Sequence, residues 1–398
     1  MAPPKTRSLA LPIALQLALS ALAFWALWGF PYRNGLLKFL GAQAEPGAVI
    51  PGPVAAPMRQ SYTGIAPVDK QLTVLVSFFY TAIDGNRADI SISFLSLGSH
   101  VIAAWVLITL EGLRAGNDGT LLLVSTTVIG LGVAIIGFAV VAPLFFAYQL
   151  YASPTVHSPT AYNLSPKHPL AVALVPVGIM IGFGLPSLIM TLPAPSVLSF
   201  DTKQLWTGIQ QGWTIWILLA TTLLTVGISY FNPDIYNLST PAAQAKTVKN
   251  MRRAYIFALA SAASAHLLPL LICGMATLFP ALFAIPYNAQ LQVSNVFRLV
   301  NIFGDLKAAS LADGALWFLQ WDTFVGVVSV FLWAFTLRAA GKREEATTRD
   351  WIVAVLKALA VTAAFGPTAY AVIAVWSRDE LELRLEKEGK STADKKDW

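Results

Sequence analysis

The chain carries a series of apolar runs, each long enough to cross the hydrocarbon core of a membrane, which takes about 20 helical residues. The runs lack the alternation of β-strands, so they predict helices rather than a barrel. Together they predict an all-α fold, a polytopic integral membrane bundle of about eight transmembrane helices. The eight runs are Leu9–Phe30, Ile90–Leu110, Leu121–Tyr148, Leu170–Leu192, Gly208–Phe231, Tyr255–Phe279, Ala315–Phe335 and Ile352–Trp376.

The connections between these runs are irregular. Residues 31–70 and 153–169 are rich in Pro, which resists helix formation. A ninth apolar run, Leu72–Ile83, is too short to span and predicts a re-entrant or interfacial helix. Residues 280–313 predict a loop with one short amphipathic helix near Val293–Phe303.

The two ends of the chain differ in character. Lys5 and Arg7 precede a first run that is too long for a signal-peptide core, so we expect a retained transmembrane helix. The last residues are strongly charged and predict a solvated tail without chemistry. We therefore expect a single transmembrane bundle over residues 1–376, followed by a charged, solvent-exposed tail over residues 377–398.

The basic residues give conflicting signals about membrane orientation. The clusters within residues 246–253 and 342–349 fall on one face of the predicted bundle, which the positive-inside rule makes cytoplasmic. Lys5, Arg7 and the basic tail argue for the opposite face. We favour the loop evidence because basic residues in short loops between spans have the strongest effect on orientation. The sequence does not indicate an oligomeric state.

Composition narrows the function classes. Only 12% of the residues are charged and the net charge is +6 without a long basic block, so no nucleic-acid partner is expected. The single cysteine, Cys273, supports neither a disulfide framework nor a thiolate metal site. No G-x-x-x-x-G-K-[ST] loop or H-E-x-x-H helix occurs, and the four histidines lie on separate segments. Asp84 and Asp89 are too widely spaced for a magnesium-diphosphate motif. We therefore expect no metal and no cofactor.

Ionisable side chains at membrane depth are costly and are candidates for function. Asp322 lies well inside the seventh run, His100 and His266 lie inside the second and sixth, and Glu111 closes the second. Either histidine can be a neutral ring bonded to a backbone carbonyl, and Glu111 can form a rim ion pair with Arg114. Asp322 must face a cavity, pair with a cation or stay protonated, so function and structure are equally good explanations for it.

The segment FFYTAIDGNRADISISF, between the ninth and second runs, combines two carboxylates and a guanidinium. Asp84, Gly85 and Asn86 suit a turn. Asp89 suits the N-cap of a helix that begins at Ile90. Turn chemistry does not explain why Asp84 directly follows FFYTAI, so we keep it as a functional candidate.

Several tryptophans lie deep within the predicted spans. Their side chains can fill the core, or they can line a pocket in which a cation is stabilised over their π faces. The deep tryptophans retained as candidates are Trp105, Trp213, Trp317 and Trp321.

The order of segments has a counterpart in a known family. One N-terminal run, a Pro/Gly-rich loop, the segment LVSFFYTAIDGNRADIS and FNPD after the fifth run resemble the membrane-bound terpene cyclases of fungal meroterpenoid pathways, of the ascofuranone, ascochlorin and macrophorin kind. These proteins often show an F-F-x-x-x-x-D-G pattern, which Phe78–Gly85 matches here. The resemblance implies a metal-free enzyme that protonates an epoxide or terminal alkene of a farnesyl chain on an aromatic or related ring, and then guides carbocation cyclisation.

The resemblance also implies roles for residues. Such a reaction needs a buried, protonated carboxylic acid, aromatic faces for the cation and exclusion of water. Asp84 is the expected proton donor and Asp322 a second acid or base. Arg87 would lower the pKa of Asp84 if the two paired, whereas pairing of Arg87 with Asp89 would leave Asp84 free. The expected substrate-positioning residues are Tyr80, Asn86, Arg87, His100, Trp105, Glu111, Trp213, His266, Trp317 and Trp321, with Asp89 a third catalytic candidate.

Two other classes remain open at this point. A non-enzymatic transporter or accessory protein of a secondary-metabolite pathway could use Asp322 and His266 in a polar path, although repeated halves are not evident. A different membrane enzyme, a hydroxylase or acyltransferase, is the other alternative. For the cyclase, the expected partners are the lipid bilayer and a lipidic prenylated substrate, and the expected location is the endoplasmic reticulum of a fungus.

The assignment of Asp84 as the donor predicts that Asp84→Asn abolishes turnover while the protein still folds. The measurement is product formation by membranes that contain the variant. Substantial remaining activity would remove Asp84 from the donor role.

Overall fold

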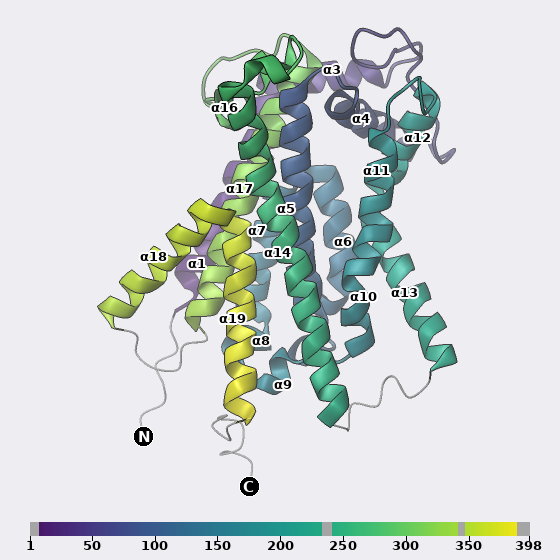
Figure 1. Ribbon diagram of the computed structural model, residues 1–398. Coiled ribbons are helices and arrows are strands. Elements are labelled where there is room, and N and C mark those ends of the chain that lie inside the picture. The colour runs from purple at the N-terminus through teal and green to yellow at the C-terminus, as the bar shows by residue number, and fades with distance from the viewer. Residues whose placement is uncertain (1–7, 233–240, 341–346, 388–398) are drawn as a thin grey trace.

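The computed structural model describes residues 8–232, 241–340 and 347–387. These residues form helices joined by loops and contain no β-strand, only two isolated β-bridges. Most of the long helices run side by side along one direction (Figure 1). The predicted all-α membrane bundle is therefore confirmed.

Six helices in this part of the chain are long and apolar enough to cross a membrane. Two of these spans contain a π turn. In one, α1 (Ala10–Phe24) continues through the π turn into α2 (Phe30–Asn34). In the other, a π turn joins α10 (Pro169–Ile179) to α11 (Leu185–Thr191). The six spans are Ala10–Asn34, α5 (Ala88–Gly112), Pro169–Thr191, α13 (Trp213–Phe231), Lys246–Leu278 within α14 (Pro241–Leu278), and α17 (Leu311–Ala340).

Three of the eight predicted runs are not single helices. The fifth, Gly208–Phe231, begins in α12 (Phe200–Gln211) and continues after Gly212 as α13. The third run breaks at Gly137 into α6 (Leu121–Ile136) and α7 (Phe138–Ala152). The eighth breaks at Gly366 into α18 (Thr348–Phe365) and α19 (Pro367–Lys387), and α18 leans away from the bundle (Figure 1). Gly137 and Gly366 have φ of 109° and 93°, a region that favours glycine, so the sequence permits a break at both places.

Helix α5 lies at the centre of the bundle, where it packs against α4 (Ala66–Ile83), α10, α14, α17 and α19. Close approach is possible because small residues meet at the interface. Ala103, Ala262 and Ala369 form one such fully buried contact between α5, α14 and α19. Small residues at helix crossings are typical of membrane bundles, where the lipid offers no hydrophobic driving force.

A helical hairpin of α3 (Leu36–Gln43) and α4 stands at one end of the bundle, beside α12 (Phe200–Gln211) (Figure 1). Helix α4 begins at Ala66 and is longer than the predicted Leu72–Ile83. Asp69 lies in the first turn of α4. Its carboxylate accepts from the backbone N–H groups of Tyr62, Thr63 and Gly64. The Thr63 N–H is the main reason why the pKa of Asp69 falls to about 2. The predicted amphipathic helix is present but short, as α16 (Val293–Phe297).

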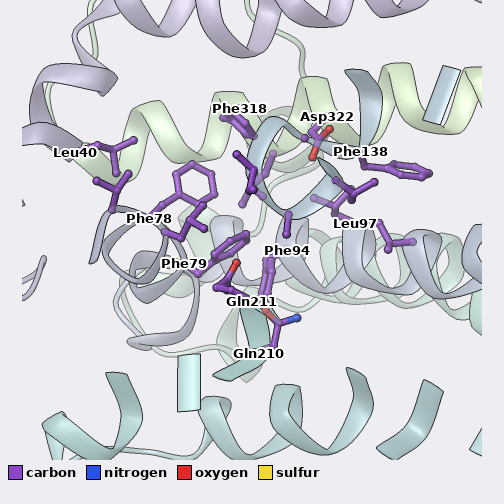
Figure 2. A pocket seen from close by; sticks show the side chains of 18 of the residues that line it. Leu40, Phe78, Phe79, Phe94, Leu97, Phe138, Gln210, Gln211, Phe318 and Asp322 are labelled. Atoms are coloured by element: carbon purple, nitrogen blue, oxygen red, sulfur yellow. Dashed lines mark hydrogen bonds between the residues drawn. The ribbon is translucent and has the colours of Figure 1, made fainter. Parts of the chain in front are cut away.

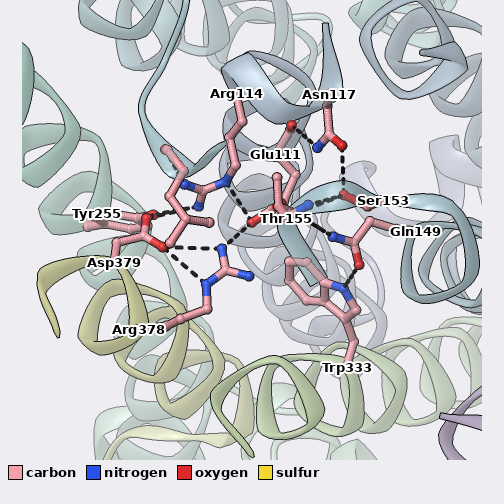
Figure 3. Close-up of polar contacts among 11 residues, drawn as sticks. Glu111, Arg114, Asn117, Gln149, Ser153, Thr155, Tyr255, Trp333, Arg378 and Asp379 are labelled. Atoms are coloured by element: carbon pink, nitrogen blue, oxygen red, sulfur yellow. Dashed lines mark hydrogen bonds and ion pairs between the residues drawn. The ribbon is translucent and has the colours of Figure 1, made fainter. Parts of the chain in front are cut away.

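A neutral cluster of two arginines and two carboxylates lies buried near the C-terminal end of α5 (Figure 3). The Glu111 Oε1 atom lies 2.9 Å from Arg114 Nε and 2.7 Å from Arg378 Nη2. Asp379 Oδ2 accepts from Arg114 Nη2 at 2.9 Å. All four side chains are at most 2% exposed, so each charge depends on its partners within the cluster.

Uncharged side chains extend this cluster across the bundle. Thr155 Oγ1 donates to Glu111 Oε2 at 3.0 Å, and the Tyr255 hydroxyl donates to Asp379. Gln149 Nε2 donates to Glu111 Oε2, and the Gln149 carbonyl oxygen accepts from the Trp333 indole at 2.9 Å. The cluster thereby joins α5, α7, α14, α17 and α19 with the short helix α8 (Pro154–His157).

This cluster corrects two predictions. Glu111 is no rim residue, because it is fully buried and pairs with Arg378 as well as Arg114. The solvent-exposed tail does not begin at residue 377, because α19 continues through it and Arg378, Asp379 and Glu382 are 1% exposed. Segment charge failed as a guide because the partners come from distant helices. Residues 388–398 of the tail, and residues 342–346 of the second basic loop, lie outside the described part.

We expect Glu111→Gln to destabilise the protein by roughly 3 kcal/mol or more, because it leaves one buried guanidinium charge unbalanced. Thermal unfolding in detergent measures the effect as a lower Tm. Asp305→Asn is the control, since the Arg33–Asp305 pair is exposed and its loss should change Tm little. Equal, small shifts for both variants would contradict the role of the cluster.

Candidate active site

A cavity of about 290 Å³ lies between the α3–α4 hairpin, α5, the α6–α7 break and α17 (Figure 2). This volume is close to the lower limit for small-molecule sites, about 300 Å³. Its walls are mainly apolar side chains from helices that are distant in sequence. The residues that line it include Trp28, Leu36, Leu40, Phe78, Phe79, Phe94, Leu97, Val101, Phe138, Phe183, Gln210, Gln211, Trp213, Phe318 and Asp322.

Aromatic rings form much of the wall. Phe78 meets Phe318 edge to face with ring centroids 5.1 Å apart, and Phe79 lies 5.3 Å from Phe94. Trp213 lies 5.4 Å from Phe183. Their π faces can stabilise a positive charge, which suits a reaction that passes through a carbocation.

Asp322 is the only ionisable side chain among the described residues that line the cavity. It projects from α17, is 4% exposed, and its Oδ1 atom accepts from the backbone N–H of Ala139 at 2.7 Å. That N–H belongs to the first turn of α7, which lacks an intrahelical partner because the chain breaks at Gly137. The carboxyl group thus caps a helix that begins inside the bundle and also faces the cavity.

Two glutamine amides supply polarity on another side of the cavity. Gln210 and Gln211 end α12 and are 5% and 6% exposed. The Nε2 atom of Gln211 donates to the carbonyl oxygens of Thr207, at 3.1 Å, and Gln210 Oε1, at 3.0 Å. Phe79 and Phe94 lie between the two amides and Asp322 (Figure 2).

Asp84, the predicted donor, does not line this cavity. It lies in the turn after α4, where its carboxylate accepts from the backbone N–H and the side-chain amide of Asn86, both at 2.8 Å. Burial raises the pKa of Asp84, whereas the Asn86 contacts and nearby Lys203 lower it. Tyr80 is buried beside it in a separate apolar cluster with Ile50.

Arg87 pairs with Asp89 and not with Asp84. Its Nε and Nη2 atoms lie 3.0 and 2.8 Å from the two Asp89 oxygens, and Nη1 lies 2.9 Å from Asp313 Oδ1. Hydrogen bonds to Asp89 are the main reason why the pKa of Arg87 rises. Asp89 lies within the first turn of α5 and Arg87 is at the N-cap, so the predicted N-cap role of Asp89 is not observed.

The other predicted residues are spread along the bundle, and of the four deep tryptophans only Trp213 lines the cavity. Trp105 supports it from behind, with ring centroids 4.6 Å apart. Trp317 packs against Phe30, and the Trp321 indole donates to the carbonyl oxygen of Val300.

The other ionisable residues that were predicted at membrane depth, His100, His266 and Glu111, do not line the cavity. His100 is buried in α5, and no described residue offers its Nδ1 atom a hydrogen-bond partner. His266 projects from α14 beside Gly366. Glu111 belongs to the ionic cluster. No three His, Cys, Asp or Glu side chains within the described ranges are grouped to hold a metal ion.

The sequence analysis missed the two glutamines and most of the aromatic wall. Phe78 and Phe79 stand in the quoted FFYTAI segment, but nothing in one sequence tells a wall phenylalanine from a core one. Gln210 and Gln211 lie within the first four residues of the fifth apolar run, and polar residues at the start of a run usually mark a helix end.

Comparisons with known proteins show the family to which this chain belongs. The CtvD domain matches residues 11–383, so the chain belongs to the CtvD-domain family. Terpene cyclase ascI of Acremonium egyptiacum is 28% identical over 94% of this chain and 93% of its own. Terpene cyclase ctvD of Aspergillus terreus is 27% identical over 94% of this chain and 100% of its own. Terpene cyclase janA of Penicillium janthinellum is 26% identical over 83% of this chain and 84% of its own. No solved structure matches the chain. The family and these relatives support a terpene cyclase.

We expect Gly137→Ala to lower both Tm and activity. An added Cβ would lie 2.7 Å from Leu27 Cδ1 and 3.3 Å from Asp322 Oδ1, at a φ of 109° that L residues rarely adopt. Gly132→Ala is the matched control. Gly132 lies within α6, and its added Cβ would be at an ordinary contact distance of 3.5 Å from the Val141 side chain. Unchanged Tm in Gly137→Ala, or equal effects in both variants, would contradict a special role for the break.

Proposed function

We propose that the protein is a terpene cyclase that protonates an epoxide or terminal alkene of a farnesyl chain, carried by an aromatic or related ring, and guides the carbocation to a ring without metal. The observation that carries the proposal is Asp322, which is the one ionisable group that residues 8–232, 241–340 and 347–387 contribute to an aromatic, apolar cavity inside a membrane bundle. A lipidic substrate can reach such a cavity from the bilayer. The endoplasmic reticulum of a fungus is the proposed location.

The chemistry is an isomerisation in which atoms balance. The proton of Asp322 forms an O–H bond with the epoxide oxygen as the C–O bond breaks and leaves a carbocation. With an alkene, the proton forms a C–H bond instead. The next π bond then forms a ring C–C bond. A carbon next to the final cation gives its proton to the Asp322 carboxylate, so that a C=C bond forms and the acid is restored. The product has the mass of the substrate.

Residues of the cavity supply the other requirements. The proposal requires Asp322 to be neutral before the reaction. After proton transfer, the Ala139 N–H at 2.7 Å stabilises the carboxylate and holds it in place. The rings of Phe78, Phe79 and Phe318 would face the developing cation and exclude the water that would trap it.

Asp322→Asn should lower cyclisation by at least about 100-fold, because an amide keeps an acceptor for the Ala139 N–H but has no acidic proton. Membranes that contain the protein are incubated with epoxyfarnesyl and farnesyl phenols without added metal, and isomers of equal mass are sought. The paired substrates separate epoxide from alkene protonation. An unchanged Tm shows that the variant is folded.

Asp84→Asn is the comparison, since Asp84 lies outside the cavity and the proposal expects most activity to remain. An inactive Asp84→Asn with an active Asp322→Asn would return the donor role to Asp84. Absence of isomers from every substrate with the unaltered protein would refute the cyclase, and accumulation of unchanged substrate across vesicles would favour a transporter.

A further inference from the structure

The cavity has a second polar feature with no role in the proton transfer. Gln210 and Gln211 are buried at the end of α12, and the aromatic side chains of Phe79 and Phe94 lie between them and Asp322 (Figure 2). A carboxamide in such a place is costly unless its donors and acceptors find partners.

Hydrogen bonds fix the orientation of this amide pair. Gln211 Nε2 uses its donors on Thr207 O and Gln210 Oε1. A reversed Gln210 amide would place its NH2 against the NH2 of Gln211, so the observed orientation is the favourable one. Among the described residues no partner occurs for the Gln210 NH2 group or for the Gln211 carbonyl oxygen. One donor and one acceptor are therefore available side by side.

The charges around the cavity restrict what this pair can bind. None of the described lining residues is Lys, Arg or His. A diphosphate or carboxylate head would be buried without a cation, at a large desolvation cost. A neutral ring with a hydroxyl group fits, because the hydroxyl can accept from the Gln210 NH2 group and donate to the Gln211 carbonyl oxygen. A ring carbonyl can accept from the Gln210 NH2 group alone.

We propose that Gln210 and Gln211 form the head-group site of the cavity, which binds the hydroxyl or carbonyl oxygen of a neutral ring and sets the orientation of its apolar chain. The assignment of the far end of that chain to Asp322 rests on the proposed cyclase function. The amide pair determines specificity and takes no part in proton transfer.

The test measures binding without turnover. The protein in nanodiscs is titrated with a tritiated phenol that carries a saturated farnesyl chain, with the same chain on an unsubstituted phenyl ring, and with the saturated farnesyl phosphate. The phenol should bind about tenfold more tightly than the phenyl compound, and the phosphate should bind no better than the phenyl compound. Gln210→Leu should reduce the phenol preference by about 3- to 10-fold.

Gln71→Leu is the matched control, because Gln71 also lines the cavity but belongs to α4. It should leave the phenol preference unchanged, and Tm is measured for both variants. An unchanged preference in Gln210→Leu, equal loss in Gln71→Leu, failure of the phenol to bind the unaltered protein, or preferential binding of the phosphate would overturn the proposal.

The cyclase assay gives an independent result. Binding that depends on Gln210, without isomers from any reactive substrate, would refute the cyclase and keep the head-group site. Cyclisation by the unaltered protein, together with a phenol preference that Gln210→Leu does not change, would support the cyclase and refute the head-group site.

Discussion

The hydrogen bond from the Ala139 N–H to Asp322 is the interaction on which the site depends. A helix that begins inside a membrane bundle exposes N–H groups that lipid cannot satisfy, and each one left unpaired costs several kcal/mol. Asp322 meets this need from α17, and the break at Gly137 brings the carboxyl group to the cavity. One residue therefore closes a backbone defect and supplies the acid of the proposed reaction, so a purely structural and a functional explanation of Asp322 do not compete.

The charged residues near the two ends of α5 are paired in different ways. Near its C-terminal end, Glu111, Arg114, Arg378 and Asp379 neutralise one another in a buried cluster that joins several helices. Toward its N-terminal end, Arg87 is held by Asp89 and Asp313, and Asp84 is left with Asn86. In the part of the chain that the structure describes, the cavity between them is lined by a single ionisable group, Asp322. This separation keeps permanent cations away from the place where a carbocation would form.

Part of this arrangement could be predicted from the sequence. Apolar run length gave the all-α membrane bundle, and the depth of Asp322 in the seventh run marked it as unusual. The same reasoning failed for Glu111 as a rim pair and for the tail after Trp376. In both cases the deciding partner lies far away in sequence, as in the Glu111–Arg378 pair, and local pattern carries no information about it. Gln210 and Gln211 read locally as the end of a helix, and nothing in the sequence marked them as cavity residues.

By itself, the sequence determined that the chain spans a membrane as helices, because runs of about 20 apolar residues leave the backbone no other way to satisfy its hydrogen bonds. It also determined where helices can break, through Gly137 and Gly366. Only the tertiary structure decided which carboxyl group faces the aromatic cavity, which charges cancel, and which amides remain available. Those outcomes depend on contacts between α12, α17 and α19 and helices distant in sequence, and such contacts exist only after the bundle has packed.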